Sequence, residues 1–387
     1  MLLEMNKLKI VGYVCQSDPF KDRGAWSGTI YKLREAIEKS GYRVVWIPYR
    51  ANSKVIWLLS HFLRVFNSHS ILYASYPLYL RSCAKSIDLQ LLESCDILFF
   101  PGLAGIMKYV ATKKPFIYFS DATFSQMVDY YWFGLDKLTR RIGNACEAWT
   151  IDNCCMIISS SHWAAQSAEV DYGCNPDKNF VIPFGANLDD KDLSPMVRTT
   201  SSPLKLLFSG VEWERKGASI AIDAVCELNR RGIDAKLLLC GIREIPSDYG
   251  QLPDCVEYLG FLNKNNPDEY RKYVNAVKES MALVLPTKAE CSAIVFCEAA
   301  GNGLPVFTYD TGGIGDYVVN GKNGYRLPLD ATAKEFADVI EQCIVNNQIP
   351  ALSSGAVDHY KKSLNWDSWA SSFKVILDNY FSSQNGE

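Results

Sequence analysis

The sequence predicts an α/β protein made of two doubly wound domains that face each other across a cleft. Its 387 residues exceed what a single hydrophobic core ordinarily accommodates. Buried strand patterns alternate with amphipathic helices, which implies parallel sheets. This series stops in a polar, turn-rich stretch at residues 189–203 and then restarts. We therefore expect domains at residues 1–192 and 204–365, a linker at 193–203, and a helix at 366–387 that could cross back to the first domain.

Composition excludes several classes of protein. The chain is 48% hydrophobic and 21% charged, so disordered and collagen-like classes are excluded. It contains no run of 18 apolar residues, and its start lacks the pattern of a signal peptide. The 13 Cys are odd in number and irregularly spaced, and there are only 4 His. We interpret the cysteines as small buried side chains of a cytoplasmic protein, without a disulfide frame or a metal site.

Charge is unevenly distributed along the chain. The net charge of −3 argues against nucleic-acid binding. Residues 1–120, however, carry 16 Lys and Arg against 8 Asp and Glu, whereas the remainder carries 24 against 35. A basic first third suggests an anionic partner for that domain, either a phosphorylated acceptor or a membrane face.

The first domain begins with a βαβ unit. Residues 8–15 and 43–48 read as buried strands, and between them Ser27 could cap a helix that ends near Gly41. The connecting loop lacks a GxGxxG dinucleotide fingerprint. The apolar run at 55–66 is either a core helix or an interfacial helix lying on a membrane. Further strands are expected at 96–100, 115–119, 156–159 and 180–183, with helices at 138–152 and 161–170.

One acid follows a predicted strand of this domain directly. Asp121 comes just after the strand at 115–119, at the strand's carboxyl end. Ligands bind at this edge of open α/β sheets. An ordinary solvated loop acid remains an equal alternative.

The second domain repeats the alternation. Strands are expected at 204–208, 235–240, 256–259, 282–285 and 306–309. Helices are expected at 217–231, 268–278, 333–345 and 366–381, the last with aromatic residues at helical spacing. The arrangement predicts a second parallel sheet.

The stretch 283–305 carries the strongest functional signal. A buried strand breaks at Pro286, Glu290 lies on the loop, and an apolar helix that contains Glu298 begins near Ser292. The helix stops at the Gly-Asn-Gly sequence that begins at Gly301. The start of a helix can hold a phosphate, and an acid inside an apolar helix needs a reason. The alternative is two ordinary surface acids on a partly exposed helix.

Residues 208–217 (FSGVEWERKG), together with this stretch, carry a family resemblance. The RKG sequence opens a helix, Glu290 and Glu298 form an E-x7-E pair, and GLPV and DTGG follow. Earlier, residues 181–185 (VIPFG) match the turn before the linker. The chain resembles the family-4 retaining glycosyltransferases (glycosyl transferases group 1) of the GT-B fold, which has two Rossmann-like domains.

The resemblance implies roles for individual residues. Arg215 and Lys216 would bind the donor diphosphate, Glu298 the ribose hydroxyls and Glu290 the donor sugar, with Asp121 near the acceptor. Asp121, Glu290, Lys216 and Arg215 would then be the catalytic group. The remaining donor-binding positions are Gly28, the backbone of Ser292, Ala293, Ile294 and Val295, and the backbone of Gly260, Phe261 and Leu262.

The expected function is metal-independent transfer of a hexose from a UDP- or GDP-sugar, without a cofactor, in polysaccharide biosynthesis. The acceptor would be a glycan, a lipid-linked molecule or a small molecule, and the basic first domain would contact the cytoplasmic membrane face. Two alternatives remain. A sugar-nucleotide 2-epimerase uses the same fold, and a catalytically degenerate scaffold would explain departures from the family pattern at Val211, Ser292 and Ala293.

Overall fold

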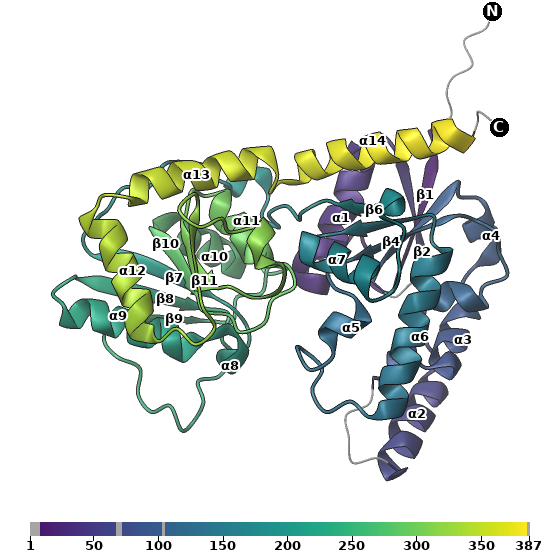
Figure 1. Ribbon diagram of the computed structural model, residues 1–387, viewed down its shortest axis with the longest axis horizontal. Helices are drawn as coiled ribbons and strands as arrows, with labels where there is room; N and C mark the ends of the chain where they lie inside the picture. Colours follow the sequence, from purple (N-terminus) through teal and green to yellow (C-terminus); the bar gives the residue numbers. More distant parts are fainter. Residues whose placement is uncertain (1–7, 67–71, 103–104, 385–387) are drawn as a thin grey trace, which may run out of the picture. The chain divides into compact units, whose positions relative to one another are not determined.

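The chain folds into two compact units. The computed structural model describes residues 8–66, 72–102 and 105–384. Unit 1 comprises the chain up to Ile182 together with the segment from Ala370 onward, and unit 2 runs from Pro183 to Trp369. Each unit contains a six-stranded sheet in which every pairing is parallel, with helices packed around it (Figure 1). The α/β fold class with two doubly wound sheets is therefore confirmed.

The sheet of unit 1 has the order β2-β1-β3-β4-β5-β6. Its strands are β1 Ile10–Cys15, β2 Arg43–Pro48, β3 Ile97–Pro101, β4 Phe116–Ser120, β5 Met156–Ser159 and β6 Asn179–Val181. The strand order reverses between β1 and β3, so loops at the carboxyl ends of the strands diverge there and leave room for a ligand.

The helices of unit 1 include the four expected near residues 27–41, 55–66, 138–152 and 161–170, the first with a different start, and three shorter helices that were not individually predicted. They are α1 Thr29–Lys39, α2 Ser53–Phe66, α3 Pro77–Ala84, α4 Leu89–Glu93, α5 Phe124–Met127, α6 Lys137–Asn153 and α7 His162–Val170. The N-cap of α1 is Gly28, with a φ of 92°, and not Ser27. Ser27 and Trp26 both have left-handed backbone angles. The chain therefore turns sharply before α1, and Ser27 does not cap it as predicted.

The sheet of unit 2 has the order β12-β11-β10-β7-β8-β9. Its strands are β7 Leu204–Ser209, β8 Ala235–Cys240, β9 Val256–Gly260, β10 Ala282–Leu285, β11 Val306–Tyr309 and β12 Gly324–Leu327. Its helices are α8 Trp213–Lys216, α9 Ala218–Arg230, α10 Pro267–Glu279, α11 Ile294–Ala300, α12 Ala333–Val345 and α13 Ile349–Lys362. The order reverses between β7 and β10, which is the arrangement of dinucleotide-binding sheets.

The polar stretch at 189–203 is fastened to unit 2. The backbone N–H of Arg198 donates to Ser353 Oγ at 2.7 Å, and its guanidinium donates to the carbonyl oxygens of Asn302 and Lys278. Phe184 and Leu188, which precede the stretch, are fully buried. This segment lacks the periodicity of a helix or strand. It nevertheless packs with unit 2, because long-range hydrogen bonds hold it there.

The last helix, α14 Trp366–Gln384, contributes its first residues to unit 2 and the rest to unit 1. Within unit 1, Phe373 is fully buried and its ring lies edge-on to Phe99 at 5.9 Å. Tyr42 donates a 2.5 Å hydrogen bond to Asp378. The end of the chain thus completes the core of the unit in which the chain begins.

Candidate functional site

The predicted site of unit 2 lies where its sheet reverses direction. Strands β7 and β10 are adjacent, and their carboxyl ends lead into α8 and into the loop 286–293. In doubly wound sheets the ligand crevice lies at this point. The site therefore combines the RKG sequence after β7 with the acidic loop after β10.

Gly217 fixes the geometry of this junction. It ends α8 and precedes α9 with a φ of 70°. A Cβ atom at this position would lie 2.2 Å from the carbonyl oxygen of Pro286, so only glycine fits. The backbone N–H of Lys288 donates to the carbonyl oxygen of Arg215 at 2.8 Å. The two loops are thus locked together by main-chain contacts.

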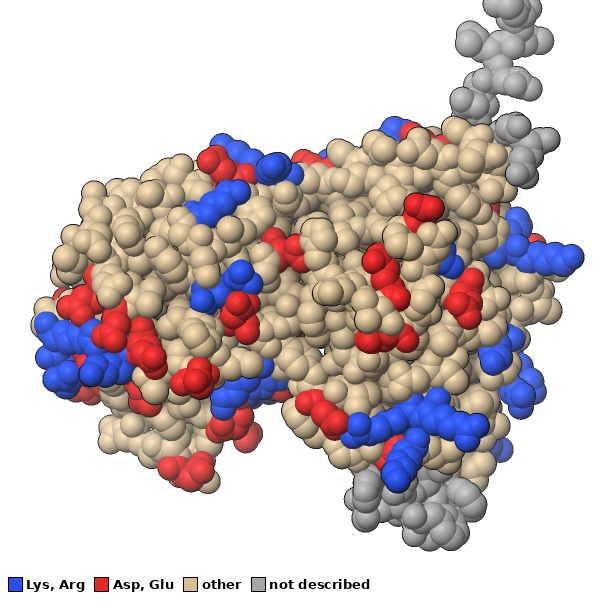
Figure 2. All heavy atoms as spheres, in the orientation of Figure 1, with Lys and Arg blue, Asp and Glu red and all other residues tan. Residues whose placement is uncertain are grey.

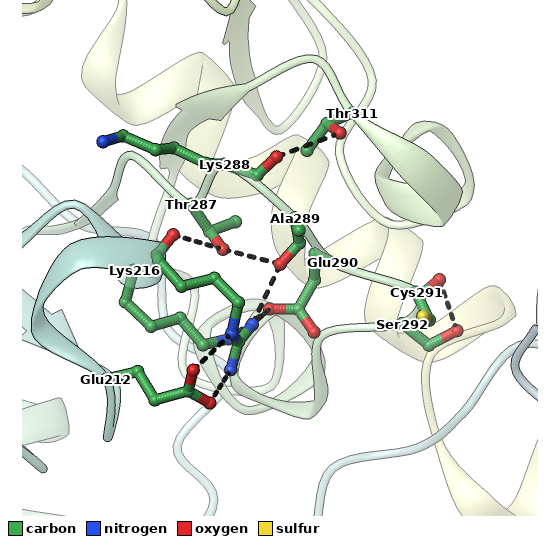
Figure 3. A network of polar contacts seen from close by, with 10 residues as sticks. Glu212, Lys216, Thr287, Lys288, Ala289, Glu290, Cys291, Ser292 and Thr311 are labelled. Atoms are coloured by element: carbon green, nitrogen blue, oxygen red, sulfur yellow. Dashed lines mark hydrogen bonds and ion pairs between the residues drawn. The ribbon is translucent and has the colours of Figure 1, made fainter. Parts of the chain in front are cut away.

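Lys216 and Glu290 form a buried ion pair at this junction. The Lys216 ammonium bonds directly to the Glu290 carboxylate, and the two side chains point toward one another in Figure 3. The exposed fraction is 9% for Lys216 and 7% for Glu290. A buried pair of this kind contributes little net stability, but removing one partner leaves an uncompensated charge.

Arg215 adds a second cation to the pair. Its Nη1 lies 4.0 Å from the same Glu290 oxygen and donates to the carbonyl oxygen of Ala289 at 2.9 Å. Glu212 receives a forked contact from the guanidinium, at 3.0 and 2.6 Å. These contacts lower the pKa of Glu212, so its carboxylate stays ionised and orients the arginine. The site therefore presents two fixed cations side by side.

Glu298 lies on α11 and is the most deeply buried acid of the site, with an exposed fraction of 1%. Lys264 Nζ lies 2.5 Å from its Oε1, and the Tyr273 hydroxyl donates to Oε2 at 2.5 Å. Burial and the nearby Glu298 carboxylate raise the pKa of Tyr273, which stays a hydrogen-bond donor. Each carboxylate oxygen keeps a further lone pair that can accept a ligand hydroxyl.

The other predicted donor positions lie at the same edge of the sheet of unit 2. The residues Ser292, Ala293, Ile294 and Val295 lead into α11, which begins at Ile294, and its N-cap residue Ala293 makes no side-chain cap. The predicted start near Ser292 is thus two residues early. Gly260 ends β9, and Leu262 lies two residues further along the loop that follows it. Between them, the ring of Phe261 lies under the Arg243 guanidinium, 3.6 Å from its centre.

The two predicted positions of the first domain both lie in unit 1. Asp121 follows β4 and lines a cavity of about 330 Å³. Gly28 caps α1. Within unit 2 the predicted side chains therefore form two groups, with Arg215, Lys216 and Glu290 in one cluster and Glu298 in a second, while Asp121 and Gly28 belong to unit 1.

Sequence reasoning missed four participants, namely Glu212, Arg243, Lys264 and Tyr273. Glu212 stands one helical turn before Arg215, a spacing that favours an ion pair and could have identified it. Lys264 and Tyr273 reach Glu298 from segments 34 and 25 residues earlier in the chain. No local pattern marks such contacts, because only the tertiary fold brings them together.

Within residues 8–66, 72–102 and 105–384, no three His, Cys, Asp or Glu side chains are grouped so that they could hold a metal ion. All thirteen cysteines are free thiols.

Two family models match the chain in succession. Glycosyltransferase Family 4 matches residues 28–190, and Glycosyl transferases group 1 matches residues 203–346. Among solved structures, sucrose-phosphate synthase from Thermosynechococcus elongatus aligns with a TM-score of 0.70 at 14% identity, over 97% of this chain and 100% of that one. Anabaena HepE in complex with UDP and glucose aligns with a TM-score of 0.64 at 17% identity, over 96% and 100%.

Alignments with curated relatives cover only part of this chain and only part of each relative. A D-inositol 3-phosphate glycosyltransferase from Corynebacterium aurimucosum is 25% identical over 61% of this chain and 58% of its own. The putative colanic acid biosynthesis glycosyltransferase WcaL of Salmonella typhimurium is 24% identical over 54% of each chain. The chain thus spans little more than half the length of these relatives.

Two parallel sheets, each with a reversal of strand order and one with paired cations and buried acids at that point, define a GT-B architecture. The two models match the two halves of the chain in order, so the chain resembles Glycosyltransferase Family 4 over residues 28–190 and Glycosyl transferases group 1 over residues 203–346.

Proposed function

We propose that this protein is a retaining glycosyltransferase that moves a hexose from a UDP- or GDP-sugar to a hydroxyl group. The observation that carries the proposal is the pairing of two fixed cations, Arg215 and Lys216, with a buried Glu298 at the reversal of the unit 2 sheet. The names of the relatives support it, as does the binding of UDP and glucose by HepE.

Each group has a role that fits its chemistry. Arg215 presents a planar fork and Lys216 a point charge, a combination suited to a diphosphate. Lys216 has three donors, so it can keep Glu290 while it bonds to a phosphate oxygen. Glu298 accepts hydrogen bonds from the ribose hydroxyls, and Glu290 from hydroxyls of the donor sugar. The amides of residues 292–295 and the loop after Gly260 border the phosphate and the base.

The proposed step is a substitution at the anomeric carbon. The bond from this carbon to the diphosphate oxygen breaks, and a bond to the acceptor oxygen forms on the same face. The acceptor proton passes to the departing diphosphate. Negative charge grows on the diphosphate in the transition state, and preorganised donors stabilise it there.

We further propose that Arg215 and Lys216 supply the charge that a metal ion supplies in other transferases. Activity is then expected to survive dialysis against EDTA with no more than a twofold loss. A loss that added Mg²⁺ or Mn²⁺ restores would contradict this proposal. The assay is release of the nucleoside diphosphate.

The acceptor side of the proposal rests on unit 1. Asp121 would lie beside the acceptor. Within the described ranges, no helix is long and apolar enough to cross a membrane. On helix α2, however, the exposed fraction is 61% for Trp57 and 46% for Leu58. Basic side chains also gather near one end of α6, whose first turns contain Lys137, Arg140 and Arg141 (Figure 2).

These surfaces lead us to propose peripheral membrane contact through α2. A Trp57→Ala, Leu58→Ser variant is expected to lose flotation with anionic vesicles, because exposed apolar side chains insert at the interface. A Val375→Ser variant, in which another exposed residue is changed, is the matched control. Equal flotation of the two variants would rule out contact through α2.

Turnover tests the proposed function itself. Wild-type protein, given a panel of UDP- and GDP-hexoses with glycan and lipid-linked acceptors, should release a nucleoside diphosphate. The product should keep the donor's anomeric configuration in NMR spectra. Lys216→Met should lower the rate by at least two orders of magnitude, and Lys236→Met, at an exposed position on β8, should not. Donor binding without consumption would favour a degenerate scaffold, and conversion of the donor alone would favour an epimerase.

A further inference from the structure

The cavity of unit 1 lies at the carboxyl ends of β3 and β4. Gly102 follows β3 directly, and Asp121 follows β4. Helix α6 forms another wall through Gly143, Cys146, Glu147 and Thr150, which share one helical face at spacings of three and four residues. The volume of about 330 Å³ is at the small end of the range for ligand pockets.

Aromatic rings make up much of the remaining wall. Trp26, Phe124 and Trp132 line the cavity, and the last two pack together at 5.2 Å between ring centres. The backbone of Trp26 has a φ of 48°, a conformation that is costly for a bulky residue. The turn before α1 thus places the Trp26 ring beside that of Phe119, with 5.9 Å between the ring centres. In this position Trp26 also lines the cavity.

Glycine lets these walls approach each other. A Cβ atom on Gly143 would lie 2.0 Å from the ring of Phe124, and one on Gly105 would lie 2.1 Å from Cys146 Sγ. Such distances cannot be accommodated without moving the wall. The cavity therefore depends on residues that leave space for aromatic packing.

Most polar side chains of the wall bond to the protein. Thr150 donates to the carbonyl oxygen of Cys146, and Ser120 to that of Ala122. Tyr118 donates to Glu147 Oε1 at 2.8 Å. Among the described residues, Glu147 Oε2 has no hydrogen-bond partner. Burial raises the pKa of Glu147 to about 7, so the carboxyl can accept or donate near neutral pH.

Positive charge is missing from the described part of this wall. None of the described lining residues is a lysine or an arginine, whereas Asp121 and Glu147 are acids. A phosphorylated ligand would enter this cavity without a counter-charge and beside two carboxyl groups. The basic character of the first third of the chain therefore does not extend to this cavity.

We propose that the cavity binds an uncharged molecule with an apolar, ring-containing body and a hydroxyl group that bonds to Glu147. The apolar body would lie among the rings of Trp26, Phe124 and Trp132, which favour flat apolar surfaces. Identifying this molecule as the acceptor of the transfer reaction rests on the proposed function. Its binding to the cavity does not.

The test is calorimetric titration of the full chain, without any nucleotide sugar, with three related probes. These are 2-naphthol, 2-methoxynaphthalene, which has lost the hydroxyl proton, and 2-naphthyl phosphate, which is anionic. We expect 2-naphthol to bind at least tenfold more tightly than the phosphate. Ala74 also lines the cavity, so Ala74→Phe should fill it and weaken the binding of 2-naphthol at least tenfold. If this variant does not fold, Ala74→Leu replaces it.

Glu147→Gln separates the hydroxyl contact from simple apolar burial. It should weaken 2-naphthol by about fivefold, as expected for one hydrogen bond, and leave the methoxy compound unchanged. Glu257→Gln, at an exposed position on β9, should change neither. Equal or tighter binding of the phosphate, unchanged binding in the cavity-filling variant, or no binding of 2-naphthol would overturn the proposal. Nucleotide binding to unit 2, measured on the same samples, shows separately whether the proposed function fails.

Discussion

At the residue scale, the site of unit 2 depends on charges that are buried and paired. Lys216 and Glu290 are both less than 10% exposed and bond to each other. The E-x7-E spacing pointed to Glu290, and the RKG sequence to Lys216. The ion pair between these two residues could not be predicted, because they lie 74 residues apart in the sequence.

Lys216→Met distinguishes a catalytic role from a structural one. The single substitution removes the cation that bonds directly to the buried Glu290 and leaves it with Arg215 at 4.0 Å, so we expect a loss of stability of up to roughly 3–5 kcal/mol. The double variant Lys216→Met, Glu290→Gln should recover most of this stability, because no uncompensated charge remains. Neither variant should recover turnover. Chemical denaturation and the diphosphate-release assay give the two readouts, and a double variant with restored turnover would refute the role of Lys216.

The raised pKa of Glu147 predicts that the free energy of unfolding depends on pH. Its pKa rises from 4.5 to about 7 on folding, so the folded state holds the proton more tightly than the unfolded chain. This contribution is complete below pH 4.5 and is lost as the pH rises through 7. The loss is at most roughly 3 kcal/mol above pH 8.

Thermal unfolding of Glu147→Gln checks this dependence. The amide cannot ionise, so the variant should be more stable than wild type by several degrees at pH 8. At pH 4, below the pKa of the unfolded chain, the advantage should disappear. A variant that gains nothing at pH 8 would show that Glu147 is not held in an environment that disfavours its charge.

At the element scale, the junction of α8, α9 and the loop after β10 positions the site. Gly217→Ala should lower the free energy of unfolding by more than the strain of a positive φ alone. The reason is that its Cβ would lie 2.2 Å from the Pro286 carbonyl oxygen. Gly232→Ala is a matched control, since Gly232 has a φ of 86° and open space around its Cβ position. We expect the control to lose about 1–2 kcal/mol and to keep nucleotide binding.

Gly217→Ala should lose more stability than this and at least tenfold in nucleotide affinity, because Arg215 and Lys216 immediately precede it. Denaturation and calorimetry on the two variants provide the comparison. Equal losses in both variants would show that the close approach of the two loops is unimportant.

Element prediction succeeded where hydrophobic periodicity is strong. Strands β2, β5, β8, β10 and β11 were predicted with the bounds that the structure shows. Strand β12 and helix α13 were not predicted. The strand is four residues long and begins with glycine, and the helix contains Pro350 and Gly355. Their local sequences argue against regular structure. Tertiary packing overrides this, since Gly355 lies so close to the Lys322 carbonyl that a Cβ would be 1.9 Å from it.

At the scale of the whole molecule, helix α14 packs most of its length into unit 1, whose sheet comes from the first half of the chain. Phe373 is fully buried against Phe99, and Val375, two residues further on, is 61% exposed. Phe373→Ala should destabilise unit 1 by about 3–5 kcal/mol, whereas Val375→Ala should have little effect. Limited proteolysis with mass spectrometry would show which unit opens first, and early cleavage in unit 2 would contradict this assignment.

The two-domain organisation could be predicted because the βα series visibly restarts at Leu204. The position of residues 183–203 could not, because the hydrogen bonds of Arg198 to unit 2 leave no local trace. The cavity of unit 1 was also not predictable beyond Asp121. Its wall combines segments between Trp26 and Thr150 that only the sheet brings together.

The proposed function requires that Glu298 hold the ribose of a nucleoside diphosphate in unit 2. Calorimetric titration with UDP, GDP and ADP tests it most directly, using wild type, Glu298→Gln and the control Glu257→Gln. We expect one of the uridine or guanosine nucleotides to bind wild type and the control equally, and to bind Glu298→Gln at least tenfold more weakly, because the ribose hydroxyls lose a charged acceptor. Undiminished binding by Glu298→Gln, or no binding of any nucleotide to wild type, would contradict the account.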